Sequence, residues 1–278
     1  MSEPYILPLR IRSRAWRMPA VQTLPRLIVV VPCYNEERRL PEEELRAFRT
    51  SHAALELLFV NDGSTDRTLD RLESMQREDP ERFRVLNLER NRGKAEAVRR
   101  GILAALDRSP DIVGFWDADL ATPLAEIDGF LDVFESRAEI EMVFAARVRL
   151  LGRSIIRNPA RHYFGRVGAT LISQSLGLAV YDTQCGAKLF RVTPMLRPLF
   201  EQPFISRWIF DVEIIARLVQ QRGRDAAVRA IFELPIMSWH DVKGSKVKQS
   251  DFLRALKDLM KIRRAYNLRH ARRTHRDQ

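Results

Sequence analysis

The chain has 278 residues, 45% of them hydrophobic, which is enough for a packed core and excludes a disordered chain. Its longest strongly apolar run, at 27–32, is far shorter than the roughly 20 residues that cross a bilayer, and the N-terminus lacks a signal-peptide core. The two cysteines, Cys33 and Cys185, show no metal-ligand spacing, which favours a reduced compartment. We therefore expect a cytoplasmic protein, with peripheral contact at the cytoplasmic membrane face left open.

The formal net charge of +11 is concentrated in two segments. Residues 147–168 contain six Arg and no acidic residue, and residues 243–278 contain twelve Lys or Arg against three Asp. Such segments suit an anionic partner, for example a phosphate substrate, a lipid headgroup surface or nucleic acid. A solvated basic face without a partner is the alternative, and it is the better interpretation of the tail after Asn267.

Residues 26–146 alternate short β-rich runs with helical patterns, which is typical of a mostly parallel sheet with helices on both faces. The chain is therefore expected to have an α/β fold. Strands are predicted at 27–32, 56–61, 83–88, 112–116 and 142–146. Helices are predicted between them, opening at 65–69, spanning 94–106, and spanning 123–136 with a proline in the first turn.

The second half of the chain is less regular. Helices are predicted at 158–178, 194–200 and 208–222, a short strand at 188–190 and a loop at 235–246. Residues 249–267 form an amphipathic helical pattern. Its apolar face is expected to contain Phe252, Leu253, Leu256, Leu259 and Met260, and its basic face Arg254, Lys257, Lys261 and Arg264. The apolar face could lie on an anionic membrane or pack on the protein's own core.

Polar motifs follow the first four predicted strands, at 34–36, 61–64, 91–94 and 117–119. In open sheets of this kind, ligands bind beyond the carboxyl ends of the strands. Each motif alone is an ordinary turn or helix start. Together they predict the polar rim of one cleft, and a helix N-terminus with Lys94 makes phosphate its natural ligand.

Asp117 and Asp119 come directly after the strand predicted at 112–116. Carboxylates at alternate positions past a strand end can hold a hard divalent cation that takes its other ligands from water and substrate phosphates. A lone pair of this kind more simply ends a strand in a solvated loop. The neighbouring motifs favour the metal site.

The motifs Pro-Cys-Tyr-Asn-Glu at 32–36, Asn-Asp-Gly-Ser-Thr-Asp at 61–66, Asn-Arg-Gly-Lys at 91–94 and Asp-Ala-Asp at 117–119 resemble, in order and spacing, the GT-A nucleotide-diphospho-sugar transferases of glycosyltransferase family 2. The likeness continues through 182–190, 207–213 and 244–246, where the chain looks like the dolichyl-phosphate glucosyltransferase branch and, more distantly, dolichyl-phosphate mannose synthases. It covers about residues 26–265. The usual acid at position 61 is Asn61 here, and the eukaryotic branch's N-terminal membrane anchor is not recognisable.

The resemblance implies a GT-A fold, a Rossmann-like sheet, and a set of donor-binding residues. These are Pro32, Tyr34, Glu36, Asp62, Arg92, Lys94, Asp117 and Ser245. The first three would contact the nucleoside, and Asp62 would bond the uracil. Ser245 and Lys246 would belong to a flexible loop that closes over the donor.

The resemblance also implies where the metal and the acceptor bind. Asp117 and Asp119 would orient and coordinate Mg²⁺ or Mn²⁺ on the donor diphosphate, with Asp119 the stronger candidate for direct ligation. Arg147 and Arg166 look like the positions that take the acceptor phosphate. Lys94 and Lys246, with the cation, would stabilise the leaving diphosphate.

The chemistry of the acceptor leaves two mechanisms open. A polyprenyl phosphate is already anionic, so the two arginines need only position it and no strong base is required. A hydroxyl acceptor needs a carboxylate base, and Asp211 or Glu213 lies in the region where related enzymes place one. Both acids could equally be a helix-start pair favoured by the helix dipole. Among the candidates for metal binding, proton transfer and leaving-group stabilisation, the expected catalytic residues are Asp119, Asp211 and Lys246.

The sequence predicts an N-terminal extension at 1–25, a glycosyltransferase domain at 26–246, and an amphipathic basic helix and tail at 247–278. The expected function is metal-dependent, inverting transfer of a hexose, glucose from UDP-glucose, to a polyprenyl or dolichyl phosphate. A soluble or saccharide hydroxyl acceptor is the alternative within the family. A non-catalytic nucleotide-sugar binder or a nucleic-acid-binding protein is the alternative from another class, but only charge supports nucleic acid, and we expect no such partner.

Overall fold

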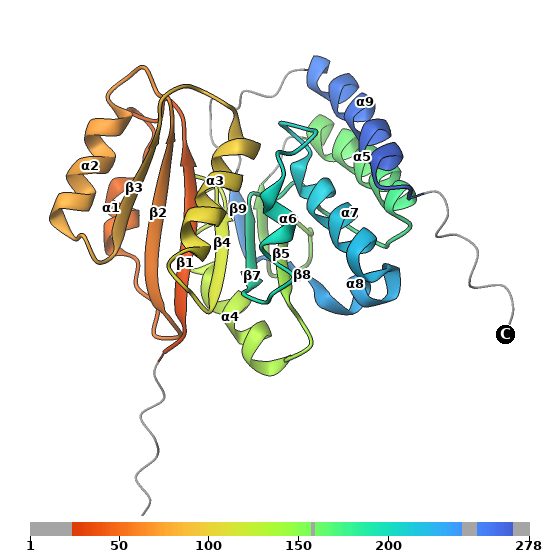
Figure 1. Cartoon of the computed structure of the whole chain (residues 1–278), viewed down its shortest axis with the longest axis horizontal. Helices are drawn as coiled ribbons and strands as arrows, with labels where there is room; N and C mark the ends of the chain where they lie inside the picture. The colour runs from red at the N-terminus through yellow and green to blue at the C-terminus, as the bar shows by residue number, and fades with distance from the viewer. Residues whose placement is uncertain (1–23, 157–158, 241–248, 269–278) are drawn as a thin grey trace, which may run out of the picture.

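A seven-stranded sheet in the order β3-β2-β1-β4-β7-β5-β8 forms the centre of the protein (Figure 1). The computed structural model describes residues 24–156, 159–240 and 249–268, without the side chains of 156, 159–166 and 249–253. All pairings in this sheet are parallel except those of β7, which runs antiparallel to β4 and β5. The strands are β1 (Arg26–Cys33), β2 (Ala54–Asp62), β3 (Phe83–Leu88), β4 (Ile112–Trp116), β5 (Met142–Ala146), β7 (Ala187–Arg191) and β8 (Ile231–Pro235). The predicted α/β fold with a mostly parallel sheet is confirmed.

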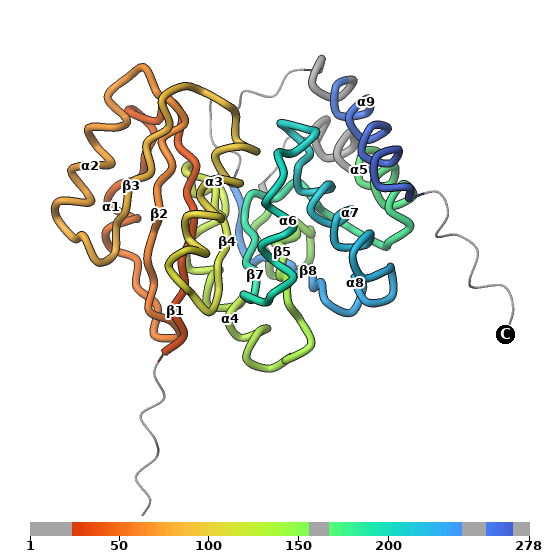
Figure 2. Tube along the Cα trace, viewed as in Figure 1, coloured from red at the N-terminus to blue at the C-terminus, as the bar shows by residue number. Residues whose placement is uncertain are grey.

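Both faces of the sheet are buried, which explains why its strands read as continuous apolar runs. In β1, Ile28 and Val30 pack on one face with α3 (Lys94–Leu106) and α7 (Phe210–Arg222), whereas Val29 and Val31 pack on the other. That other face is covered by α1 (Glu42–Ala47), α2 (Thr68–Glu78) and α4 (Glu126–Ser136). Figure 2 shows the helical layers on either side of the sheet.

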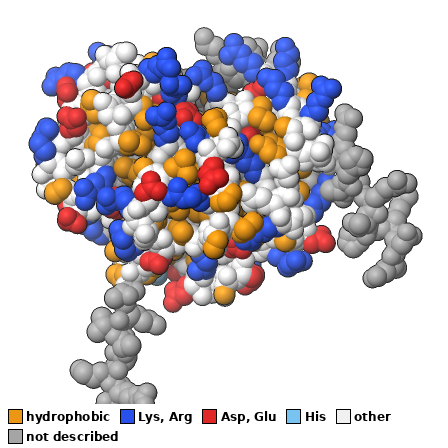
Figure 3. Space-filling model, viewed as in Figure 1, with side chains coloured by type: hydrophobic (Ala, Val, Ile, Leu, Met, Phe, Trp, Pro, Cys, Tyr) orange, Lys and Arg blue, Asp and Glu red, His pale blue; other side chains and the backbone are white. Residues whose placement is uncertain are grey.

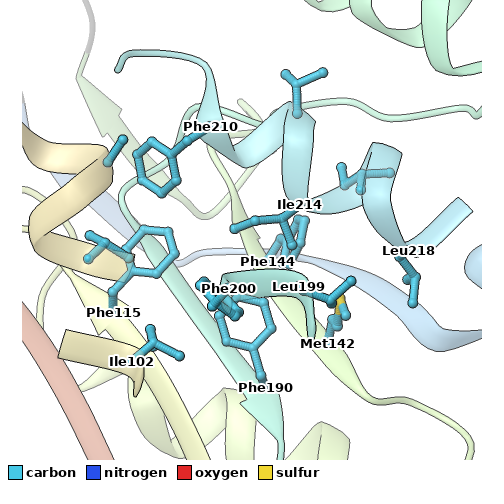
Figure 4. Packing of buried hydrophobic residues seen from close by; sticks show 14 of the residues in the cluster. Ile102, Phe115, Met142, Phe144, Phe190, Leu199, Phe200, Phe210, Ile214 and Leu218 are labelled. Carbon is cyan, nitrogen blue, oxygen red and sulfur yellow. The ribbon is translucent and has the colours of Figure 1, made fainter. Parts of the chain in front are cut away.

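Aromatic side chains attach α7 to the centre of the sheet (Figure 4). The Phe210 ring at the start of α7 lies 5.5 Å, centroid to centroid, from Phe115 of β4. Phe190 of β7 lies 6.1 Å from Phe144 and 5.7 Å from Phe200, which belongs to the short helix α6 (Pro198–Glu201). Offset and edge-to-face contacts of this kind add to the free energy of apolar burial. They fix the first turn of α7 beside the carboxyl end of β4.

The second half departs from the prediction in several places. Residues 235–246 were predicted as a loop, but β9 (Ser238–His240) pairs in parallel with β6 (Ser154–Ile156), so the prediction is wrong at 238–240. The strand depends on a partner more than 80 residues away, which no local pattern encodes. The prediction also missed α1, β6, β8 and α8 (Arg224–Ala230). Helices predicted from 65, 123 and 194 begin at Thr68, Glu126 and Pro198.

Two further helices, α5 (Pro159–Leu176) and α9 (Gln249–Ala265), pack side by side (Figure 1). Leu259 and Ile262 of α9 are buried against this part of the core, whereas Leu256 and Met260 are exposed. The apolar face predicted for this helix therefore divides between the core and solvent. Within the described residues, no helix combines the length and apolar character needed to cross a membrane.

Two helical glycines provide a matched test of this packing. A Cβ at Gly101 of α3 would lie 2.3 Å from Val30 Cγ1 and 2.8 Å from Val60 Cγ2, whereas one at Gly129 of α4 would meet only Leu234 Cδ2 at 3.5 Å. Gly101→Ala should lower the free energy of unfolding by about 1–3 kcal/mol because rigid buried valines cannot withdraw. Gly129→Ala should leave it unchanged or raise it by up to about 1 kcal/mol. Urea unfolding of both variants checks this, and equal effects would contradict the close packing of α3.

Candidate functional site

The carboxyl ends of β1, β2 and β4 meet at one edge of the sheet, and the loops that follow β1 and β2 are bonded to each other. The Asn35 N–H donates to Ser64 Oγ over 3.1 Å, and Asn35 Oδ1 accepts from the Thr65 N–H over 2.9 Å. The Glu36 N–H donates to Thr68 Oγ1 over 2.8 Å. Asn35 has a positive φ of 52°, which asparagine tolerates better than most residues. The predicted nucleoside contacts, Pro32, Tyr34 and Glu36, therefore lie in or beside a rigid loop pair.

Asp62 ends β2 and holds the third loop. Its two carboxylate oxygens accept hydrogen bonds from the Arg92 and Gly93 N–H groups, at 2.7 and 2.8 Å. Burial raises the pKa of Asp62, and these two bonds oppose the rise. Gly63 has a φ of 61°, and a Cβ there would lie 2.4 Å from the Arg90 carbonyl carbon. Asp62 thus fixes the start of α3, and its contact with a uracil stays a prediction.

Asp117 and Asp119 lie just past β4, as predicted, and Lys94 reaches them from the first residue of α3. The Lys94 ammonium contacts Asp117 Oδ1. Loss of hydration lowers the pKa of Lys94, but the charges of Asp117 and Asp211 outweigh this effect and raise it overall. Asp119 Oδ1 accepts from the Ala121 N–H over 3.1 Å. Burial and the charge of Asp117 raise the pKa of Asp119.

Gly186 gives the Asp117 carboxylate its space. The Asp117 N–H donates to the Gly186 carbonyl over 2.9 Å, and a Cβ on Gly186 would lie only 1.9 Å from Asp117 Oδ2. Any larger residue at 186 would therefore displace the carboxylate. This glycine follows the loop 182–185, so a segment some 70 residues after Asp117 in the sequence completes its surroundings.

The acid pair fits a hard divalent cation. Two carboxylates side by side supply oxygen ligands, and a cation of the Mg²⁺ class takes the remainder from water and phosphate. No third protein carboxylate joins them among the residues that the structure describes. There, the single group of three ligand-type side chains within 4.8 Å of one another is His52, Asp132 and Glu135, which is exposed. His52 precedes β2, at the opposite edge of the sheet.

Lys188 is completely buried beneath the site. Its Nζ lies 2.8 Å from Asp211 Oδ1 and donates to the Cys185 carbonyl over 2.6 Å. The same ammonium lies 5.3 and 5.2 Å from the ring centroids of Phe115 and Phe144. Burial raises the pKa of Asp211, and the charges of Lys188 and Lys94 oppose the rise. Lys188 therefore joins the sheet to α7 and to the loop that leads to Gly186.

Glu213 is the other acid considered as a base, and both of its carboxylate oxygens accept hydrogen bonds from neighbouring groups. Its Oε1 accepts from Arg217 and from the Tyr266 hydroxyl at 2.7 and 2.8 Å, and its Oε2 accepts from the Ile205 N–H at 2.8 Å. It connects the start of α7 to the end of α9. These contacts are those of a residue that holds two helices together, and a role of Glu213 as a base stays a prediction.

Arg147, which directly follows β5, was predicted to take the acceptor phosphate. In the structure it binds Asp182. Its Nε and Nη2 donate to the two Asp182 oxygens over 2.7 and 2.8 Å, and the guanidinium lies 5.2 Å from the Trp239 ring centroid. Burial alone would lower the pKa of Arg147, but Asp182 raises it well above its usual range. The side chain of Arg166, and Ser245 and Lys246 entirely, lie outside the described residues.

Three residues at the site did not receive individual roles from the sequence. Lys188 and Gly186 lie in the run 182–190. An acid, a glycine and a lysine just before or within a short apolar strand were the sequence feature that could have indicated a role for them. Arg207 donates from Nε to the Arg92 carbonyl over 3.1 Å and packs along Gly93. It attaches the loop before α7 to the third loop of the rim.

The sequence profile described as Glycosyl transferase family 2 matches residues 28–196, from β1 to just beyond β7. The chain belongs to glycosyltransferase family 2. This confirms the family predicted from the four motifs, and the protein is a glycosyltransferase.

Relatives of this family 2 glycosyltransferase match it over most of its length. Dolichyl-phosphate beta-glucosyltransferase from Saccharomyces cerevisiae is 31% identical over 266 residues, covering 87% of this chain and 75% of the yeast protein. The Homo sapiens protein of the same name is 32% identical over 277 residues, covering 90% of this chain and 78% of the human protein.

Solved structures show the same fold. Glucosyl-3-phosphoglycerate synthase from Mycobacterium tuberculosis, in complex with Mn²⁺, uridine diphosphate and glucosyl-3-phosphoglycerate, gives a TM-score of 0.59 at 20% identity. The match covers 87% of this chain and 80% of that one. A second complex, with Mn²⁺, uridine-diphosphate-glucose and phosphoglyceric acid, also gives 0.59, at 19% identity. The GT-A fold of the glycosyltransferase is confirmed.

A double-mutant cycle tests the buried pair. Lys188→Met should lower the free energy of unfolding by about 3–5 kcal/mol, because it leaves the Asp211 carboxylate buried without its cation. The double variant Lys188→Met/Asp211→Asn should recover most of this loss, since neither buried charge then remains. Urea unfolding of the two single variants and the double variant measures the coupling. Additive losses in the double variant would contradict a direct interaction.

Proposed function

We propose that this glycosyltransferase transfers glucose from UDP-glucose to a polyprenyl phosphate of the dolichyl type, with a divalent cation and inversion at the sugar carbon. One observation carries the choice of acceptor: both candidate bases already have cationic partners. Asp211 is paired with buried Lys188, and Glu213 accepts from Arg217 and Tyr266. An acceptor that is already anionic removes the need for a base. The relatives named dolichyl-phosphate beta-glucosyltransferase support the same choice.

The donor side of the proposal rests on the acid pair. Asp117 and Asp119 would hold Mg²⁺ or Mn²⁺, which when bound neutralises charge on the donor diphosphate. The charges of Asp117 and Asp211 raise the pKa of Lys94 and so keep it protonated. Its ammonium would stabilise the charge that develops on departing UDP. The rim that Asp62 and the Arg92 N–H hold in place would bind the nucleoside, together with the predicted contacts Pro32, Tyr34 and Glu36.

The acceptor side rests on cations. Arg147 and Arg166 would position the acceptor phosphate, and Ser245 and Lys246 would close over the donor. Arg147 directs both its Nε and Nη2 to Asp182. Binding a phosphate would therefore use its remaining N–H groups, on Nη1 and Nη2, or exchange one of these bonds. Single in-line attack by the phosphate oxygen forms the new bond to the sugar carbon as the bond to UDP breaks.

A second candidate keeps the donor and changes the acceptor to a small phosphorylated acid. The similarity of fold to glucosyl-3-phosphoglycerate synthase favours it, since that enzyme's complexes contain UDP-glucose and phosphoglyceric acid. This acceptor is an anion, but its reacting group is a hydroxyl, which needs a base to take its proton. The pairing of Asp211 and Glu213 with cations therefore favours the lipid phosphate, whose reacting oxygen is already charged.

Labelled UDP-glucose, offered with Mn²⁺ and either a polyprenyl phosphate or 3-phosphoglycerate, tests the choice. We expect label to enter an organic-extractable product with the lipid phosphate and none to enter a water-soluble product. Transfer to 3-phosphoglycerate alone would overturn the lipid acceptor in favour of the second candidate. Removal of the metal with EDTA should stop transfer, and re-addition of Mn²⁺ should restore it.

Asp119→Ala tests the metal assignment. It should lower turnover with Mn²⁺ by at least about 100-fold, because a cation that stabilises the leaving group contributes several kcal/mol to the transition state. It should also weaken Mn²⁺ binding in the presence of UDP, measured by calorimetry. Asp225→Ala, an exposed acid in the first turn of α8, is the matched control and should change neither. Near-normal turnover in Asp119→Ala would refute the assignment.

A further inference from the structure

Helix α9 has a second face that the core does not use. While Leu259 and Ile262 are buried, Leu256 and Met260 are 36% and 57% exposed. The residues Lys257, Lys261 and Arg264 are exposed on the same half of the helix, at spacings of three or four residues from one another. We call Leu256, Met260 and these three basic residues the α9 outer face. Figure 3 shows Lys and Arg side chains gathered at the upper right of the view, where Figure 1 places α9.

The outer face combines two features that select its partner. Exposed apolar side chains flanked by basic ones are typical of a helix that lies in the interface of a bilayer. Anionic headgroups attract the basic residues, and the apolar side chains enter the acyl boundary. A nucleic acid would satisfy the charges but would leave Leu256 and Met260 without an apolar environment. Charge complementarity and apolar exposure together therefore favour an anionic lipid surface.

The position of α9 relative to the site supports this choice. It packs on α5 and α7, and α7 begins beside Asp211 at the carboxyl edge of the sheet. Further exposed apolar side chains lie in loops at this edge: Leu150 and Leu151 after β5, and Ile205 and Trp208 before α7. Tryptophan is favoured at membrane interfaces because one part of its ring is apolar and the other polar.

We propose that the α9 outer face docks the protein on an anionic lipid bilayer with the carboxyl edge of the sheet turned toward the membrane. This rests on the proposed function, because only a lipid-linked acceptor requires the site to face a bilayer. The docking surface would bring the cleft to the phosphate of an acceptor whose tail stays in the membrane. No part of the chain needs to cross the bilayer for this.

Two substitutions matched in exposure test the surface. Met260 is 57% exposed on α9, and Val228 is 56% exposed on α8. The full-length protein should sediment with phosphatidylcholine vesicles that contain phosphatidylglycerol, more weakly as salt rises, and not with phosphatidylcholine alone. Met260→Asp should weaken this binding by at least about tenfold, and Lys257→Glu/Lys261→Glu by a similar factor. Val228→Asp should leave it unchanged.

Several results would overturn the docking surface. These are equal losses in Met260→Asp and Val228→Asp, equal binding to vesicles with and without phosphatidylglycerol, and binding of the protein to RNA but not to vesicles. A dimer in light scattering that Met260→Asp converts to a monomer would assign the face to a second copy instead.

Transfer to a short-chain, water-soluble polyprenyl phosphate without vesicles separates this inference from the proposed function. Met260→Asp should match the unaltered protein in that assay and fall behind it only with a long-chain acceptor in anionic vesicles. If the protein transfers glucose to the soluble acceptor but binds no vesicles, the docking surface fails and the proposed function stands. If it binds vesicles through this face but glucosylates no lipid phosphate, the proposed function fails while the docking of α9 on the membrane stands.

Discussion

The buried ammonium of Lys188 joins the parts of the protein that make up the site. It belongs to the one strand of the sheet that runs antiparallel to its neighbours, and it binds Asp211 of α7 and the carbonyl of Cys185. Removing a charge from water is unfavourable, so such a group persists only where partners surround it. Here a carboxylate, a carbonyl and two aromatic rings do so. The Asp117 pocket and the start of α7 are consequently fixed by the same group.

Three carboxylates around the cleft are paired with cations: Asp117 with Lys94, Asp211 with Lys188, and Asp182 with Arg147. Asp62 accepts two backbone N–H groups instead. Within the described part of the chain, Asp119 has no ion-pair partner of its own, although it lies beside Asp117. Asp119 therefore adds a negative charge beside the Asp117–Lys94 pair. A divalent cation held by Asp117 and Asp119 would share Asp117 with Lys94 and would leave the pairs of Asp211 and Asp182 as they are.

The sequence predicted most of the first half because its elements are local. Strands such as Ile112–Trp116 are short apolar runs followed by polar motifs, and parallel order then brings Asp62, Lys94 and Asp117 to one edge. It could not show that Gly186 makes room for Asp117, or that Lys188 neutralises Asp211, because both contacts join distant segments. β9 was missed for the same reason, since three residues acquire strand geometry only by pairing with β6. Leu256 and Leu259 share an apolar pattern, and only the packed helix distinguishes the buried one from the exposed one.

The antiparallel strand β7 also sets an order of assembly during synthesis. It lies between β4 and β5, so β5 has no place in the sheet until residues 187–191 have been made. Some 70 residues separate the end of β4 from the start of β7, which a ribosome adds in roughly 4–14 s at 5–20 residues per second. During that interval, the edge of β4 and the two acids beyond it lack the strand and the glycine that later enclose them. The nascent chain thus presents an open sheet edge to chaperones, and its acid pair reaches its final surroundings only after the last third of the protein begins to emerge.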